Sequence, residues 1–190
     1  AIQAVETDLP VEETSNRWTI LVKEAQEMAT HGTSLHPQQV FRICQGGWTV
    51  DRDVRLMGDL SGNRRADLVV FGCSGTWVSL NNGDRTFKAL EHLSKGFATD
   101  AGGWDAKRHP RLLADVNGNS KMDTGGFGGA GVWIAQSNCD GTFQKSRLVL
   151  RDFGYDSNWR VEKHQRFAVY LTGNGAADTL AFGDDGIRVS

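Results

Sequence analysis

The chain has 190 residues, enough for one domain of ordinary size, and its 21 basic and 23 acidic residues give a formal net charge of -2. This balance leaves no electrostatic footprint for nucleic acid or an anionic membrane, so neither is an expected partner. With 23 glycines, six tryptophans and three prolines, the composition favours short strands joined by tight turns.

The cysteines and the lengths of the apolar runs exclude further classes of protein. Cys44, Cys73 and Cys139 are odd in number and far apart, which predicts neither a disulfide framework nor a metal pair and leaves at least one thiol free within the chain. No run approaches the roughly 18 apolar residues of a membrane helix, so no membrane insertion is expected. The first ten residues do not read as a signal peptide, and any targeting signal is expected to be gone already. The localisation stays unknown, with secretion slightly favoured over the cytoplasm.

The N-terminal part is the least regular. Residues 1–17 are polar and acidic, and we predict an N-terminal arm. Residues 18–47 resemble an incomplete repeat copy, since Trp18-Thr-Ile-Leu-Val is similar to Trp77-Val-Ser-Leu. The segment VKEAQEMATH within it has helical propensity.

An internal repeat organises the rest of the chain. In each copy a tryptophan is followed seven residues later by an arginine, eleven residues later by a turn motif, and then by Phe-Gly twelve residues after the turn begins. The tryptophans are Trp48, Trp104 and Trp159, the arginines are Arg55, Arg111 and Arg166, and the phenylalanines are Phe71, Phe127 and Phe182. We expect these phenylalanines in the core.

The repeat predicts an all-β fold of β-propeller blades. Each copy of 55–56 residues reads as about four short strands, and the copies fall at approximately 18–74, 75–130 and 131–190 of a propeller region spanning 18–190. Propellers generally close with four to eight blades. Either a second chain closes a six-bladed ring as a homodimer, or the natural protein is longer.

Two of the turn motifs have the spacing of calcium loops. Oxygen-bearing side chains stand at positions 1, 3, 5 and 9, and a backbone carbonyl at position 7 adds a ligand. The ligand sets are Asp59, Ser61, Asn63, Arg65 and Asp67 in the first loop, and Asp115, Asn117, Asn119, Lys121 and Asp123 in the second. Two carboxylates per loop predict modest affinity for calcium, and Tyr170 in place of the first aspartate predicts an empty third loop. The alternative is an Asx-rich turn closed by side-chain to backbone hydrogen bonds.

The segments ADLVVFGCSG and MDTGGFGGAG, each after a D-x-[SN]-G-N loop, resemble FG-GAP or VCBS repeats. Together with GTWVSLNNGDRTF and GVWIAQSNCDGTF, they are most similar to the mushroom propeller lectins of the Psathyrella velutina type. This resemblance implies N-acetylglucosamine bound in pockets between neighbouring blades and calcium in the blade loops. It covers residues 46–190 well and 18–45 poorly.

Sugar pockets pair an aromatic face with a few fixed polar groups. The candidate sugar-binding residues are Trp48, Trp104, Trp159, Arg55, Arg111, Arg166, His109 and His164, with Trp77 and Trp133 as a second set. The alternative for the tryptophans is packing between blades. For the arginines it is pairing with loop aspartates or capping of strand carbonyls.

The sequence therefore predicts a multivalent carbohydrate-binding lectin that recognises glycans carrying N-acetylglucosamine. No catalytic motif stands out from the repeating background, so we do not expect an enzyme. A protein-binding FG-GAP adhesion or scaffold module is the main alternative, and a non-catalytic domain attached to an enzyme is a weaker one.

Overall fold

The computed structural model describes residues 49–190, which lie within the second of two compact units, residues 38–190. The predicted arm at 1–17, the incomplete copy at 18–47 and the first tryptophan of the repeat, Trp48, lie outside the described residues. None of the helices in the described part is long and apolar enough to span a membrane.

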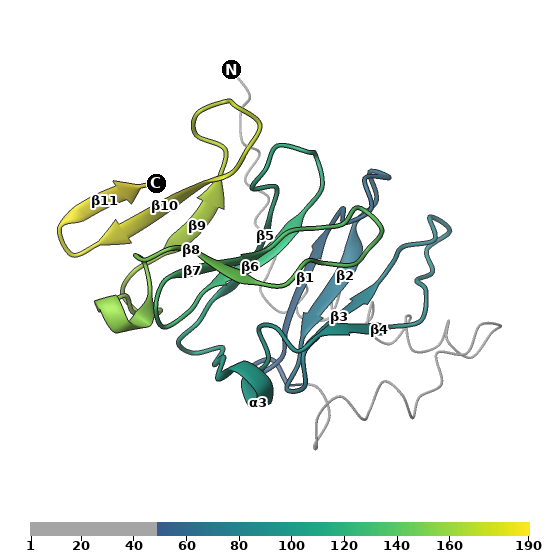
Figure 1. Cartoon of the computed structure of the whole chain (residues 1–190), viewed down its shortest axis with the longest axis horizontal. Coiled ribbons are helices and arrows are strands. Elements are labelled where there is room, and N and C mark those ends of the chain that lie inside the picture. Colours follow the sequence, from purple (N-terminus) through teal and green to yellow (C-terminus); the bar gives the residue numbers. More distant parts are fainter. Residues whose placement is uncertain (1–48) are drawn as a thin grey trace, which may run out of the picture. The chain divides into compact units, whose positions relative to one another are not determined.

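The described residues form three antiparallel sheets (Figure 1). Blade 1 contains β1 (Val54–Gly58), β2 (Asp67–Phe71), β3 (Thr76–Ser79) and β4 (Glu91–Ser94). Blade 2 contains β5 (Arg111–Ala114), β6 (Asp123–Phe127), β7 (Val132–Ala135) and β8 (Arg147–Leu150). Blade 3 contains β9 (Arg166–Val169), β10 (Asp178–Gly183) and β11 (Gly186–Val189). The prediction of all-β propeller blades is confirmed.

The first strands of the three blades are neighbours. β5 lies beside both β1 and β9, while β4 and β8 are the fourth strands of their sheets (Figure 1). This is the arrangement of propeller blades around an axis, with first strands innermost. Each sheet begins at the strand that follows the repeated tryptophan, so the sheets run 54–94, 111–150 and 166–189.

The second strands of blades 1 and 2 are buried on both faces. All five residues of β6 and four of the five in β2 are buried, so neither strand shows the alternation of a sheet with one wet face. Gly126 in β6 makes room for a neighbouring side chain, because a Cβ there would lie 2.7 Å from Cζ3 of Trp104. β2 and β6 are therefore covered from both sides by parts of the propeller.

The two hydrophobic clusters lie between blades. The first joins Leu60, Val69, Phe71, Val78 and Phe97 to Ala135 of blade 2. The second joins Phe127, Val132, Ile134, Phe153 and Trp159 to Ala181 of blade 3. Apolar burial thus binds each blade to the next.

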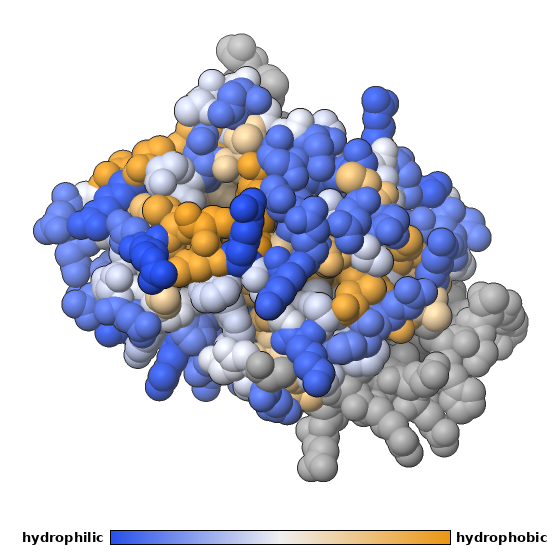
Figure 2. Space-filling model, in the orientation of Figure 1, coloured by the Kyte–Doolittle hydropathy of each residue, from blue (hydrophilic) through white to orange (hydrophobic). Residues whose placement is uncertain are grey.

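The predicted core phenylalanines differ between blades. Phe71 is 1% exposed and Phe127 is 2% exposed, which confirms two of the three predictions. The prediction is wrong for Phe182, which is 42% exposed, because no described residues form a further blade against it. Figure 2 shows apolar surface gathered over β9 to β11.

The two cysteines in the described part of the chain differ. Cys73, in the turn between β2 and β3, is bonded in a disulfide. Cys139 is exposed and free, as expected for at least one of the three thiols.

Candidate functional site

The predicted sugar-binding residues gather on the linkers between blades. Each linker begins with a phenylalanine in the left-handed backbone region, Phe97 (φ 58°) or Phe153 (φ 61°). One helical turn follows, α3 (Thr99–Gly102) in the first linker and η1 (Tyr155–Ser157) in the second. The linker then reaches the repeated tryptophan and enters the next blade.

Backbone hydrogen bonds hold each linker over the preceding blade. The N–H of Asp100 donates to the carbonyl of Cys73 (3.0 Å), and the N–H of Asp156 donates to the carbonyl of Gly129 (3.0 Å). Both acceptors lie in the turn between the second and third strands. The two blade junctions therefore have the same local geometry.

Arg111 and Arg166 hold these linkers from the inner strands. Arg111 is 7% exposed and donates from Nη1 to the carbonyl of His109 (3.0 Å) and from Nη2 to that of Phe97 (3.2 Å). Arg166 is 9% exposed and donates from Nη1 to the carbonyl of Phe153 (2.8 Å). Each guanidinium thus donates to carbonyls of its linker, not to the strand carbonyls or loop aspartates that the sequence offered as alternatives.

Both arginines keep polar atoms without a partner among the described residues. These are Nε of Arg111, and Nε and Nη2 of Arg166. Burial lowers the pKa of each guanidinium to about 10, so both are charged at neutral pH. Buried donors of this kind are costly unless an acceptor satisfies them.

His109 and His164 have the same role in their linkers. Nδ1 of His109 accepts the N–H of Asp105 (3.1 Å), and Nδ1 of His164 accepts the N–H of Arg160 (3.0 Å). At the corresponding position of blade 1, Asp53 accepts the N–H of Thr49 through Oδ2 (2.7 Å). The residue five positions after each tryptophan is therefore an acceptor that closes the linker.

This acceptor role makes the stability depend on pH. Burial, and next the charge of Arg111, lower the pKa of His109. Its stabilising contribution is therefore complete above the unfolded pKa of about 6.5 and is lost as the pH falls through the lower folded value. We expect the free energy of unfolding, measured with urea, to fall less between pH 7 and 5 in His109→Asp than in the wild type. Equal losses in the two proteins would contradict this role.

The repeated tryptophans pack at the junctions. Trp159 is 5% exposed and belongs to the second hydrophobic cluster, where its Nε1 donates to Oδ1 of Asp152 (3.2 Å). Trp104 is half-buried, with its ring 4.9 Å from that of Phe97 and 5.5 Å from that of His109 between centroids. Trp104 thus keeps an accessible part beside Arg111, whereas Trp159 serves mainly in packing.

Two further predicted residues lie on third strands. Trp77 and Trp133 are both half-buried, on β3 and β7. The ring of Trp77 lies 4.7 Å from that of His92, and its buried Nε1 has no partner among the described residues. Arg55, the counterpart of Arg111 in β1, is exposed.

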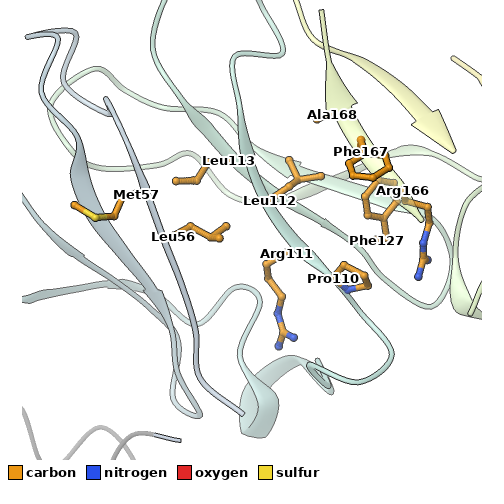
Figure 3. Close-up of a pocket in the computed structure, with 10 residues that line it drawn as sticks. All are labelled: Leu56, Met57, Pro110, Arg111, Leu112, Leu113, Phe127, Arg166, Phe167 and Ala168. Carbon is orange, nitrogen blue, oxygen red and sulfur yellow. The ribbon is translucent and has the colours of Figure 1, made fainter. Parts of the chain in front are cut away.

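A cavity of about 280 Å³ lies along the inner strands, between β1, β5 and β9. Leucines from β1 and β5 line part of it, and Arg111 and Arg166 line another (Figure 3). In Figure 3 both arginine side chains extend in the same direction, toward the strand ends where the linkers enter. The structure thus brings two predicted site residues to one cavity.

The repeat pattern of the sequence does not indicate the group around Tyr155. The guanidinium carbons of Arg160 and Arg108 lie 3.9 Å and 5.1 Å from the centre of its ring. The ring of His109 lies 6.1 Å from the same ring. The linker after blade 1 has Thr99 at the corresponding position. Tyr155 therefore differs from its repeat counterpart, and this difference was the sequence feature that could have drawn attention to it.

The first two loops are closed by their own hydrogen bonds. Asp59 accepts the backbone N–H groups of Gly62 and Asn63 through Oδ1 and that of Arg64 through Oδ2, at 2.6–3.1 Å. Asp115 accepts four N–H groups, from Asn117 to Ser120, at 2.5–3.2 Å. This is the Asx-rich turn that the sequence left as the alternative.

The last aspartates of these two loops also accept backbone hydrogen bonds. Asp67 accepts the N–H groups of Leu60 (3.0 Å) and Asn81 (2.8 Å), and Asp123 accepts those of Val116 (3.1 Å) and Ser137 (2.7 Å). No group of three or more His, Cys, Asp or Glu residues in the described part of the chain is placed to hold a metal. The oxygen donors suit calcium in type, but an ion must compete with these hydrogen bonds.

A lectin of Agrocybe aegerita is similar to this chain in sequence and structure. It is 44% identical with a TM-score of 0.74, and its structure is described as the basis of specific recognition of non-reducing terminal N-acetylglucosamine. The match covers 76% of this chain and 36% of the lectin, so the chain matches about a third of that lectin's length.

Two further solved structures share the fold at lower identity. The TcdB2–TccC3 complex without its hypervariable C-terminal region is 18% identical, with a TM-score of 0.57 over 74% of this chain and 6% of that one. The Tc holotoxin pore of Photorhabdus luminescens is 18% identical, with a TM-score of 0.56 over 73% and 6%. No protein-family model and no curated protein matches the chain, so the resemblance to FG-GAP or VCBS repeats stays a prediction.

Proposed function

We propose that this chain is a carbohydrate-binding lectin that recognises terminal N-acetylglucosamine at the junctions between its blades and catalyses no reaction. The observation that carries the proposal is the 44% identity to the Agrocybe aegerita lectin over 76% of this chain. Glycans that carry N-acetylglucosamine are accordingly the proposed partners.

The junction residues have the chemistry that such a sugar needs. An N-acetylglucosamine residue offers a carbonyl oxygen and hydroxyl groups as acceptors, and the guanidinium groups of Arg111 and Arg166, which line one cavity, are donors of the matching kind. The half-buried Trp104 beside Arg111 offers an aromatic ring for the apolar face of the sugar. The repeat of these groups makes the lectin multivalent, and weak binding at one site then becomes avidity on a glycan-coated surface.

Calcium belongs to the proposal as a weakly held ion of the first two loops. The side chains of Asp59, Asp67, Asp115 and Asp123 would supply its carboxylates. Their oxygens already accept backbone hydrogen bonds, which supports low affinity and a fold that does not depend on the ion. The third loop is excluded, since Tyr170 replaces its first carboxylate and Asp178 accepts the N–H groups of Leu171 and Thr172.

Calorimetric titration tests the proposal. N-acetylglucosamine is expected to bind at least about 10-fold more tightly than glucose, which lacks the acetamido group and its hydrogen bonds. EDTA is expected to leave this affinity within about twofold, because the loops and Arg111 lie at opposite ends of β5. Millimolar calcium chloride is expected to raise the melting temperature, through binding to the native state alone.

Absence of binding to N-acetylglucosamine and to every glycan on an array would remove the lectin proposal. The adhesion or scaffold module that binds a protein partner would then take its place. A homodimer that closes the ring also belongs to the proposal, because three blades form only part of a propeller.

A further inference from the structure

The two linkers bring a set of polar and aromatic side chains together beside blade 2. We define the Tyr155 group as Tyr155 and Arg160 of the second linker with Arg108 and His109 of the first. Blade 2 has a described blade on each side, since β5 lies beside both β1 and β9. The surroundings of this group are therefore those of an inner blade, and all its members belong to the described residues.

A row of three rings joins the Tyr155 group to Trp104. The ring of His109 lies 5.5 Å from that of Trp104 and 6.1 Å from that of Tyr155 between centroids. All three side chains are half-buried, so each keeps accessible surface. A pyranose ring is about as wide as one of these rings, so the row offers more positions than a single sugar at Trp104 fills.

The Tyr155 group offers hydrogen bonds rather than a stacking face. The guanidinium of Arg160 lies over the Tyr155 ring (3.9 Å to its centre), where Nη1 donates to the carbonyl of Tyr155 (2.6 Å). The side chain of Arg108 is 58% exposed, and its ion pair with Asp105 involves Nε. Because Nδ1 of His109 accepts an N–H, Nε2 carries the proton of the neutral ring and is a donor.

The charges near this group balance, which favours a neutral ligand. Residues 104–109 and 155–162 contain the cations Lys107, Arg108 and Arg160 and the anions Asp105, Asp156 and Glu162. An equal number of charges of each sign gives little net attraction for an anion. A neutral ligand rich in hydroxyl and carbonyl oxygens can still accept hydrogen bonds from Arg108, His109 and Tyr155.

Blade 1 has no equivalent of this group. The first linker carries Thr99 at the position of Tyr155 and Asp105 at the position of Arg160. Asp53 takes the place that His109 has before blade 2. The group is therefore particular to blade 2 and is not part of the repeat.

We propose that the Tyr155 group binds the second sugar of a glycan whose terminal N-acetylglucosamine lies at Trp104. Arg108, Nε2 of His109 and the hydroxyl of Tyr155 hydrogen-bond to oxygens of this second sugar, and Arg160 holds the ring of Tyr155 in place. The inference rests on the proposed function and deepens it, because it makes the ligand a disaccharide end rather than a single sugar.

Calorimetric titration with two methyl β-glycosides tests this subsite on the whole chain. One is that of N-acetylglucosamine, and the other is that of its β1→4-linked disaccharide. The wild type is expected to bind the disaccharide at least about 10-fold more tightly, through the added hydrogen bonds. Tyr155→Thr, which introduces the residue of the first linker, is expected to reduce this ratio to within about twofold of unity.

Two further variants separate the subsite from a loss of folding. Arg108→Met changes an exposed side chain and is expected to reduce the ratio of the two affinities at least about threefold. Tyr170→Thr is the matched control, because Tyr170 is the other tyrosine of the chain, is 54% exposed and lies in the third loop, so it is expected to keep the wild-type ratio. Circular dichroism verifies that each variant is folded.

The failure of this subsite differs from the failure of the lectin proposal. A wild type that binds the two glycosides equally would overturn the subsite alone. A preference for the disaccharide that both Tyr155→Thr and Arg108→Met retain would also overturn it, since the second sugar would then bind elsewhere. If neither glycoside bound, the proposed function itself would fall.

Discussion

Replacing Arg111 with methionine is expected to lower the free energy of unfolding by about 3 kcal/mol. The guanidinium is 7% exposed and donates to the carbonyls of His109 and Phe97, which methionine leaves without this donor. The contact between the guanidinium and Trp104 (5.5 Å to the ring centre) is lost as well. Urea unfolding followed by tryptophan fluorescence measures the change.

Arg108→Met is the matched control for this experiment. Its side chain is 58% exposed and makes one ion pair, from Nε to Oδ2 of Asp105 (3.7 Å). Exposed pairs of this kind contribute little, so a change within about 0.5 kcal/mol is expected. If Arg111→Met were as stable as Arg108→Met, the arginine would not hold the junction.

Replacing Asp123 with alanine is expected to cost a similar amount, about 3 kcal/mol. Asp123 is 0% exposed, and its two oxygens accept the N–H groups of Val116 and Ser137. Alanine leaves both donors without this acceptor and leaves a cavity in the loop. Thermal and urea unfolding, each in EDTA, measure the loss without a contribution from calcium.

Asp140→Ala controls for the loss of an aspartate from a loop. Asp140 is exposed and, among the described residues, accepts hydrogen bonds from the N–H and hydroxyl of Thr142, two residues on, so little change is expected. A loss for Asp123→Ala that appears only when calcium is present would show that the ion, rather than the hydrogen bonds, holds the loop.

The blades could be predicted because their signals repeat. The spacing from Trp104 to Arg111 and on to Phe127 recurs in each copy, and a recurrent spacing predicts a recurrent supersecondary unit. The same logic failed for Phe182, because its exposure depends on the next blade rather than on its own copy. Burial is a tertiary property that a local pattern does not contain.

The candidate site was predictable only in part. The repeat located Arg111 and His109, but it did not distinguish a ligand contact from a cap on a linker. One signal was present, since the position five residues after each tryptophan holds Asp53, His109 or His164, all of which accept hydrogen bonds. Tyr155 escaped because it departs from the repeat, and calcium loops and Asx-rich turns share the same spacing of oxygen atoms.

The hydrophobic clusters show that the sequence repeat and the group of residues that packs together are different stretches of the chain. Each cluster is drawn mainly from one blade and its linker and is completed by an alanine of the next blade. Proteins built in this way gain stability from nearest-neighbour interfaces rather than from the isolated repeat. Gene duplication can therefore add one blade at a time. Each added blade covers the face of the blade before it and leaves its own face uncovered, until the ring closes.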